Sequence, residues 1–208
     1  MQKDLTTMPG YKINEYSLVL TPHEELRNRL MQVRKEFNEK YNAYSFRMNT
    51  MSRPHLLIAR FKQLEMMEER ITNRIKTVAM GFKPFKVELK DFGSLPTHTI
   101  FIQANTKDAI RSLVKQLKSE QRVMKINDDN KPYFIDDPMI PVAQKISAAQ
   151  YEKAWPEYSQ RHFAAKFIAD SMLLIKRRAG EKTWQIAEKL PFMNLPVVTR
   201  QGELFLGA

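Results

Sequence analysis

The chain has 208 residues, of which 43% are hydrophobic and 27% charged, the balance of a folded globular protein with one large domain or two small lobes rather than of a disordered chain. It contains no cysteine, which excludes disulfides, thiolate nucleophiles and cysteine-based zinc sites, and a cytoplasmic location is therefore expected. The formal net charge of +11 favours polyanionic partners, and the absence of both a signal-peptide pattern and an apolar run of about 18 residues predicts no membrane span.

The first predicted elements are a strand and a long amphipathic helix. Residues 16–20 (YSLVL) form an apolar run typical of a buried strand. Thr21, Pro22 and Glu24 then predict a helix start, with the threonine as cap and the proline at the first helical position. The helix should continue to about residue 41, because apolar side chains recur at helical spacing: Leu26, Leu30, Val33, Phe37 and Tyr41.

A second strand and helix follow, and then a hairpin. Residues 55–61 (HLLIARF) predict the strand, and a helix is expected next from the spacing of Leu64, Met67, Ile71, Ile75 and Val78. Residues 85–104 are interpreted as two strands that turn around 93–96 (GSLP), where glycine and proline suit a turn.

The remaining elements are one helix, a connection, and a second group of strands. Asn105 or Thr106 is expected to cap a helix with Ala109, Ile110, Leu113 and Leu117 on its inner face. Residues 118–137 are polar and are interpreted as a surface connection and as the boundary between lobes. A strand at 140–146, a capping box from Ser147 to Gln150 that opens a helix, and three strands (FAAKFI, SMLLIKR and TWQIAEKL) complete the chain, with a turn at 178–181 between the last two.

The two halves show a weak internal correspondence. Each has a residue followed by proline just before a strand, at 53–54 and at 137–138, with a helix and further strands later. A duplicated lobe would explain this pattern, although alternation of strands and helices is common in proteins of this class. Tails without a strong period are predicted at 1–14 and 193–208, and a folded domain at 15–192.

Several runs together resemble one known family. Residues 54–61 (PHLLIARF) resemble the first signature of the two-histidine phosphoesterase superfamily, which includes the bacterial 2′-5′ RNA ligase and RNA 2′,3′-cyclic phosphodiesterase group. That signature is a histidine, any residue, then threonine or serine, followed by apolar residues. Residues 87–102, 138–143 and 183–192 are similar to later family segments in the same order, so the resemblance covers about 16–192. It implies an α+β fold of two pseudo-symmetric lobes of sheet and helix around a central cleft.

The resemblance also implies a mechanism, because residues two apart on a strand point to the same face. A histidine and a hydroxyl from each lobe would thus enter one cleft, where one imidazole removes a proton, the other protonates the leaving oxygen, and the hydroxyls bind phosphoryl oxygens. This chain keeps only His55, since Leu57, Met139 and Pro141 stand at the other three positions. Loss of one acid–base partner costs about 10²–10⁴ in rate. His55 is therefore the one predicted catalytic residue, with residual activity at most, and is expected to face Met139 across the cleft.

Other side chains have two possible interpretations. His55 could instead be a core histidine of an apolar strand, and Tyr16 and Lys145, the candidate ligand-binding residues, could lie in the core and in solvent respectively. His23, His98 and His162 are interpreted as structural or surface residues, and the pairs at 128–129 and 136–137 as solvated loop carboxylates. No metal site is expected, and without a glycine-rich phosphate loop or dinucleotide fingerprint no cofactor is expected either.

Three functions remain open from the sequence. The first is a binding protein for a nucleotide, an RNA end or another phosphate compound, favoured by the resemblance and the net charge. The second is an enzyme in which His55 acts with a different group supplied from a loop, and the third is an interaction module with no ligand. A cleft lined mainly by Leu57, Met139 and Pro141 would favour the third, and one lined by Lys, Arg and Tyr the first. The basic charge can also occur in proteins that bind no nucleic acid, and the oligomeric state is not predicted.

Overall fold

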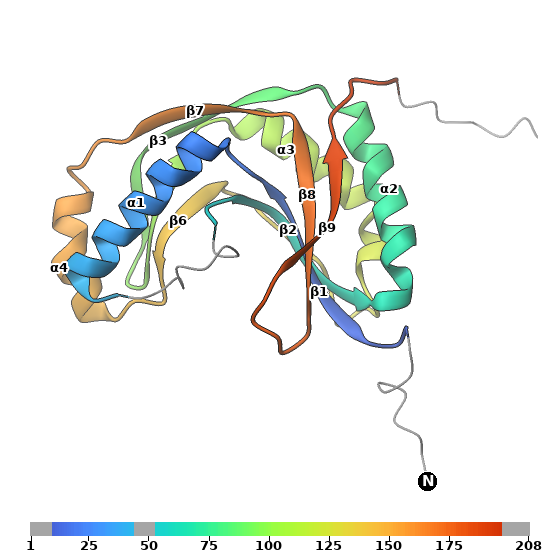
Figure 1. The fold of residues 1–208 in the computed structure, drawn as a ribbon, viewed down its shortest axis with the longest axis horizontal. Helices are drawn as coiled ribbons and strands as arrows, with labels where there is room; N and C mark the ends of the chain where they lie inside the picture. Colours follow the sequence, from blue (N-terminus) through green and yellow to red (C-terminus); the bar gives the residue numbers. More distant parts are fainter. Residues whose placement is uncertain (1–9, 44–52, 197–208) are drawn as a thin grey trace, which may run out of the picture.

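Two antiparallel sheets form the framework of the computed structural model, which describes residues 10–43 and 53–196 (Figure 1). Sheet A has the strand order β5-β2-β1-β8-β9, and sheet B the order β6-β4-β3-β7. The strands of sheet A are β1 (Ile13–Leu20), β2 (Leu56–Leu64), β5 (Tyr133–Phe134), β8 (Ser171–Arg178) and β9 (Gln185–Pro191). Those of sheet B are β3 (Phe85–Leu95), β4 (Thr99–Ala104), β6 (Met139–Gln144) and β7 (Ala164–Ala169).

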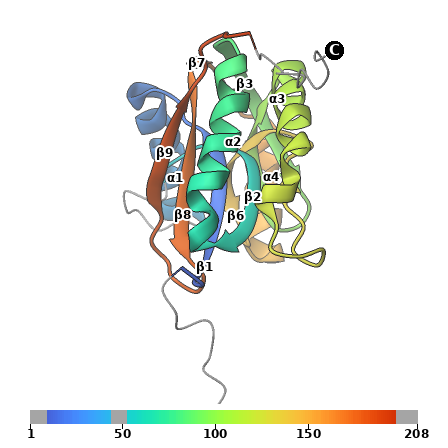
Figure 2. The same cartoon turned by 90° about the vertical axis from the view of Figure 1, so that its right-hand side faces the viewer.

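Each sheet is covered by two of the four α-helices in the described residues. Helices α1 and α4 pack on β6 and β4 of sheet B, whereas α2 and α3 pack on β8, β9 and β2 of sheet A (Figures 1 and 2). Their bounds are α1 (Glu24–Tyr41), α2 (Glu68–Gly81), α3 (Lys107–Ser119) and α4 (Ala148–Tyr158), with short 3₁₀ turns η3 (Glu65–Met67) and η4 (Gln121–Met124). The expected α+β fold of two sheet-and-helix lobes is confirmed.

The predicted lobe boundary at 118–137 is wrong. That segment contains β5, which joins sheet A by pairing Ala59 with Phe134 and Arg60 with Tyr133. The chain also crosses repeatedly between the sheets, because each sheet takes strands from both halves of the sequence. A strand of two residues is too short to show a period of two, so the sequence pattern gave no sign of it.

Of the predicted helix starts, the one of α1 is wrong and the one of α4 is confirmed. Helix α1 begins at Glu24 with His23 as the cap residue and no side-chain capping bond, so Thr21 is not the cap. The His23 carbonyl accepts the first helical hydrogen bond from the Arg27 amide at 3.0 Å, and two glutamates in the first turn complement the helix dipole. In α4 the predicted capping box is confirmed: the Gln150 amide donates to Ser147 Oγ at 3.3 Å, and the Ser147 amide donates to Gln150 Oε1 at 2.9 Å.

The hairpin and both ends differ slightly from expectation. Strand β3 continues through Gly93 to Leu95, so Gly93 lies within the strand and not in the turn. A Cβ at Gly93 would lie 2.6 Å from the Phe101 ring of the paired strand, and only glycine allows this approach. The predicted tails at 1–14 and 193–208 lie mostly outside the described residues, which begin at residue 10 and end at residue 196. Strand β1 starts at Ile13, and the amides of Asn194 and Leu195 donate to carbonyls at the end of α2. In the described part of the chain, no helix is both long and apolar enough to cross a membrane.

A polar network fixes α2 to the outer face of sheet A. Tyr16 is fully buried, its ring stacks on Phe61 with centroids 5.3 Å apart, and its hydroxyl donates to Glu68 at 2.9 Å. The same carboxylate accepts from Lys176 Nζ at 2.6 and 2.8 Å. Burial and this carboxylate raise the pKa of the Tyr16 hydroxyl far above its ordinary value. The Glu68 carboxylate therefore accepts hydrogen bonds from two side chains beneath the helix, those of Tyr16 and Lys176.

We expect Glu68→Ala to lower the free energy of unfolding by about 1–3 kcal/mol, because Tyr16 and Lys176 lose a partner in a partly buried place. Urea denaturation of the variant and the natural protein measures this difference. Glu69→Ala is the matched control, since Glu69 is exposed in the same turn of α2. Equal losses in the two variants would show that the network contributes nothing beyond helix propensity.

Candidate functional site

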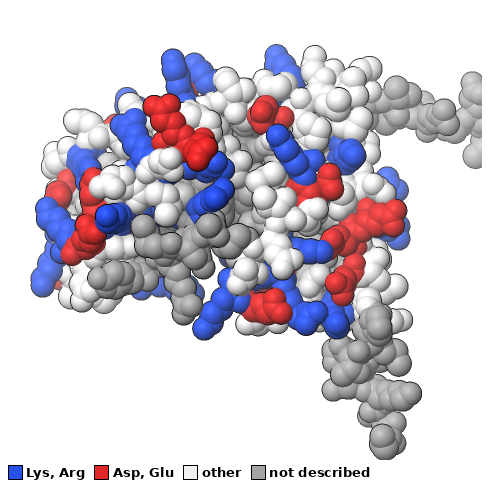
Figure 3. Space-filling model, viewed as in Figure 1, with Lys and Arg blue, Asp and Glu red and all other residues white. Residues whose placement is uncertain are grey.

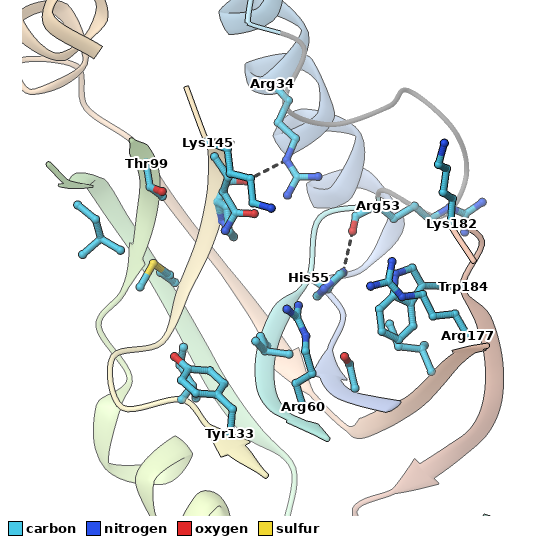
Figure 4. A pocket seen from close by; sticks show the side chains of 18 of the residues that line it. Arg34, Arg53, His55, Arg60, Thr99, Tyr133, Lys145, Arg177, Lys182 and Trp184 are labelled. Carbon is cyan, nitrogen blue, oxygen red and sulfur yellow. Dashed lines mark hydrogen bonds between the residues drawn. The ribbon is translucent and has the colours of Figure 1, made fainter. Parts of the chain in front are cut away.

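A cavity of about 920 Å³ lies between the two sheets. Its walls come from β1, β2, β5 and β8 of sheet A, from β4 and β6 of sheet B, from α1, and from the connection between β8 and β9 (Figure 4). We call it the interlobe cavity. Its lining includes Ser17, Arg34, Arg53, His55, Leu57, Arg60, His98, Thr99, Tyr133, Met139, Pro141, Lys145, Arg177, Lys182 and Trp184.

All four positions singled out by the sequence signatures line this cavity. His55 directly precedes β2, Leu57 is the second residue of that strand, and Met139 and Pro141 lie on β6 of the other sheet. Because residues two apart on a strand share a face, each strand presents its pair to the same space. The expectation that His55 and Met139 lie across one cleft is therefore confirmed.

His55 is held as a neutral imidazole. Its Nδ1 lies 2.9 Å from the Arg53 carbonyl, and since a carbonyl only accepts, Nδ1 carries the proton and donates (Figure 4). Burial lowers the pKa of His55 to about 4, and the positive charges of Arg34 and Arg60 act in the same direction. At neutral pH the free Nε2 can thus accept a proton or a hydrogen bond but has no proton to donate.

Six lysine and arginine side chains line the cavity, and no carboxylate is among the lining residues of the described chain. They are Arg34, Arg53, Arg60, Lys145, Arg177 and Lys182. Arg177 is neutralised by Glu15, with Nη2 2.5 Å from the carboxylate, and its guanidinium lies 4.6 Å from the centroid of the Trp184 ring. The cavity therefore carries an excess of positive charge suited to an anion.

Arg34 is the most deeply placed of these cations. It is 4% exposed, on the face of α1 that packs on β6, and its Nε donates to the Pro141 carbonyl at 2.9 Å (Figure 4). Burial lowers the pKa of Arg34 to about 10, so the guanidinium stays charged at neutral pH. An anion in the cavity would offset the cost of keeping this charge away from water.

Two further features of the cavity wall are unusual. Ser17 is 1% exposed, and its Oγ has no hydrogen-bond partner in the described residues, although buried hydroxyls normally find one. Lys145, just after β6, has a φ of 55°, in the left-handed region that a side chain disfavours. Strained backbone of this kind is concentrated at binding and catalytic sites.

Tyr16 does not reach the cavity, so its candidate role in stacking on a base is wrong. The neighbouring residue Ser17 faces the cavity, and side chains alternate between the faces of a strand. Tyr16 consequently points to the other face, where it packs under α2 in the core. Lys145 does line the cavity and remains a candidate ligand-binding residue.

A family model described as the 2'-5' RNA ligase superfamily matches residues 22–181. The chain belongs to this superfamily. Three solved structures are similar to it: Escherichia coli LigT complexed with phosphate, the same protein complexed with 3'-AMP, and TT0787 of Thermus thermophilus. Among curated proteins, no sequence matches the chain.

The three solved structures share the fold of this chain at low sequence identity. The phosphate complex is 11% identical with a TM-score of 0.60, and the 3'-AMP complex 10% identical with a TM-score of 0.58; each match covers 87% of this chain and 98% of the other. TT0787 is 14% identical with a TM-score of 0.62, over 86% of this chain and 98% of its own. Identities this low establish the fold alone.

The sequence alone did not predict several of the residues that line the cavity. His98 was interpreted as structural or surface, yet it lines the cavity at its exposed rim, with Nδ1 2.7 Å from Thr99 Oγ1. His23 and His162 are exposed and do not line it, as expected. Asp128, also as expected, is a loop carboxylate and pairs with Lys125. Arg34 had a signal, because it occupies a position of the buried stripe of α1 together with Asn38.

Proposed function

We propose that this protein binds a phosphorylated ligand, a nucleotide or an RNA end, in the interlobe cavity without efficient two-histidine catalysis. The observation that carries this proposal is a cavity with six cationic side chains and no lining carboxylate in the described residues. On the face in Figure 3, by contrast, Lys and Arg are interspersed with Asp and Glu. Within the chain's overall charge of +11, the cavity thus differs from that face in having cations without carboxylates among its described lining residues, which favours a binding protein over a module without ligand.

The solved structures support a nucleotide as the ligand class. LigT has been crystallised with phosphate and with 3'-AMP, and its fold matches nearly the whole of this chain. A cavity of about 920 Å³ is large enough for such a ligand. Arg34 and Lys145 supply charge for phosphate, and the half-buried Trp184 offers an aromatic face for a base.

The residues at the signature positions support weak catalysis. Cleavage of a cyclic phosphate needs a base on one side of the phosphorus and an acid on the other. His55 can supply the base, but the Met139 side chain has no proton to give, and Leu57 and Pro141 have no hydroxyl to bind phosphoryl oxygens.

One observation favours a second candidate, an enzyme with altered chemistry. His98 is a second histidine in the cavity, carried by the loop between β3 and β4 and hydrogen-bonded to Thr99. A histidine–threonine pair contains the same two functional groups that the second signature has lost. In this candidate His55 acts as base and His98 as acid, and it predicts turnover that depends on both side chains.

We expect the natural protein to bind 3'-AMP and Arg34→Gln to bind it at least about 10-fold more weakly, the range for loss of a charge-assisted hydrogen bond. Glutamine can still donate to the Pro141 carbonyl, so the comparison removes mainly the charge. Isothermal titration calorimetry at low salt measures both affinities, with Arg27→Gln on the same helix but outside the cavity as control. Thermal unfolding checks that the variants fold. Absence of binding by the natural protein would overturn the proposed function.

A further inference from the structure

The cavity holds more positive charge than one phosphate can neutralise. Arg53, Arg60, Lys145 and Lys182 all line it, and in the described part of the chain none of these four forms an ion pair. A phosphodiester carries one negative charge, and a terminal phosphate about 1.5 to 2 at neutral pH. A ligand with a single phosphate would thus leave about half of these cations uncompensated, even without counting Arg34.

These cations are also divided between two walls. Arg34 and Lys145 belong to the wall of sheet B, since Arg34 is bonded to Pro141 of β6 and Lys145 follows that strand. Arg53 and Lys182 belong to the wall of sheet A, at the entrance to β2 and in the connection between β8 and β9. Figure 4 shows Arg34 and Lys145 on one side and Arg53 and Lys182 on the other, with His55 lower in the view and bonded to the Arg53 carbonyl. A ligand with two phosphates can place one of them against each wall.

Two observations independent of charge point to a ligand in the same place. The hydroxyl of Ser17 is buried in the cavity wall and has no partner among residues 10–43 and 53–196, as expected for a group whose partner belongs to a ligand. The left-handed backbone of Lys145 fixes the direction in which its side chain leaves β6, at a cost of about 1 kcal/mol or more.

We propose that the interlobe cavity takes a ligand with two or more phosphate groups, one bound by Arg34 and Lys145 and another by Arg53 and Lys182. The inference rests on the proposed function, since it concerns the same site, and it adds the number and placement of the phosphates. Two kinds of ligand have this chemistry: a nucleoside polyphosphate and a short single-stranded RNA. His55, neutral and with Nε2 as acceptor, lines the same cavity and can accept a hydrogen bond from a ribose hydroxyl of such a ligand.

The test compares 3'-AMP, ATP and a single-stranded RNA of four nucleotides by calorimetry at several salt concentrations. At least one of the two multi-phosphate ligands should bind about 10-fold or more tightly than 3'-AMP. If that ligand is RNA, the logarithm of its binding constant should fall with the logarithm of salt concentration with a slope of about −1.4 or steeper, at about −0.7 for each phosphate contact. Whichever of ATP and RNA binds more tightly identifies the kind of multi-phosphate ligand that the cavity fits.

Two variants test the two walls separately. Lys145→Gln and Lys182→Gln should each weaken the preferred multi-phosphate ligand about 10-fold, whereas 3'-AMP, which occupies one wall, should respond strongly to only one of them. Both lysines are exposed, so folding should be unaffected, and Lys76→Gln on the outer face of α2 is the matched control. If 3'-AMP binds as tightly as both larger ligands and with the same salt slope, this inference is overturned while the proposed function stands. If no ligand binds, both are overturned.

Discussion

The natural protein is expected to hydrolyse a 2′,3′-cyclic mononucleotide at least about 10²-fold more slowly than an enzyme with two catalytic histidines, the lower end of what one acid–base partner contributes. The leaving oxygen must receive a proton, and Met139, which lines the cavity, stands at the second-histidine position in the sequence resemblance described above. Initial rates measured by chromatography of the linear product, against a two-histidine enzyme under the same conditions, give the ratio.

The missing hydroxyls should lower the rate further. Leu57 and Pro141 stand where the signatures place threonine or serine, and each lost oxyanion donor costs about 10² or more when removed alone. The losses need not multiply, since members of one catalytic unit act together. Arg34 and Lys145 can bind the phosphoryl oxygens in their place, which would preserve affinity for the ground state without restoring proton transfer.

Recovery of activity is therefore expected only when Leu57→Thr, Met139→His and Pro141→Thr are combined. Pro141 has an effect of its own, because proline donates no backbone hydrogen bond and the pairing of β4 with β6 is shifted between Ile100 and Phe101, where Phe101 pairs with Pro141. The threonine would thus also need the strand to regain a regular register, and the expected recovery is partial.

Robust turnover by the natural protein would contradict this prediction and would direct attention to His98. In that case His55→Ala and His98→Ala should each abolish activity, and the second candidate function would replace the binding function. His162→Ala is the control, since that histidine is exposed and does not line the cavity. Activity that survives both alanine variants would contradict the second candidate function, because it would need neither histidine.

Local sequence rules predicted most elements but not the charge of the site. The capping box at Ser147 and the apolar stripe of α3 depend on neighbours in sequence, and both are found as expected. Arg34 becomes part of the cavity only because α1, which follows β1 of sheet A, packs on sheet B. The signature around His55 predicted one part of the site, and the cations came from elements whose packing no local pattern shows.

Tyr16 and Lys145 illustrate two further features of the site that the sequence could not predict. The period of two along β1 shows that Tyr16 and Ser17 face opposite sides, but which side becomes the cavity is decided by the placement of α2 over sheet A. Lys145 carries a left-handed backbone conformation that is rare for lysine, so propensity could not predict it. Both limits are tertiary effects: packing selects the face of a strand and maintains the strained residue.

Acidification from pH 7 to pH 5 is expected to destabilise the natural protein more than His55→Gln, by about 2 kcal/mol. The folded-state pKa of His55 is about 4, below the ordinary value of 6.5, because burial and two nearby arginines disfavour the imidazolium. The unfolded chain therefore binds more protons than the folded one between these two values. The stability that neutral His55 contributes is complete above about pH 6.5 and is lost as the pH falls toward 4.

Urea denaturation at half-unit intervals from pH 7 to pH 5 measures this difference. The window lies above the ordinary pKa of the carboxylates, so their titration adds little and is common to both proteins. Glutamine can still donate a hydrogen bond to the Arg53 carbonyl, which makes His55→Gln a close replacement without a titrating group. His162→Gln, at an exposed site, should retain the full acid sensitivity of the natural protein. Parallel stability curves for all three proteins would show that His55 titrates in the folded state as it does in the unfolded one, and that the cavity does not hold it neutral.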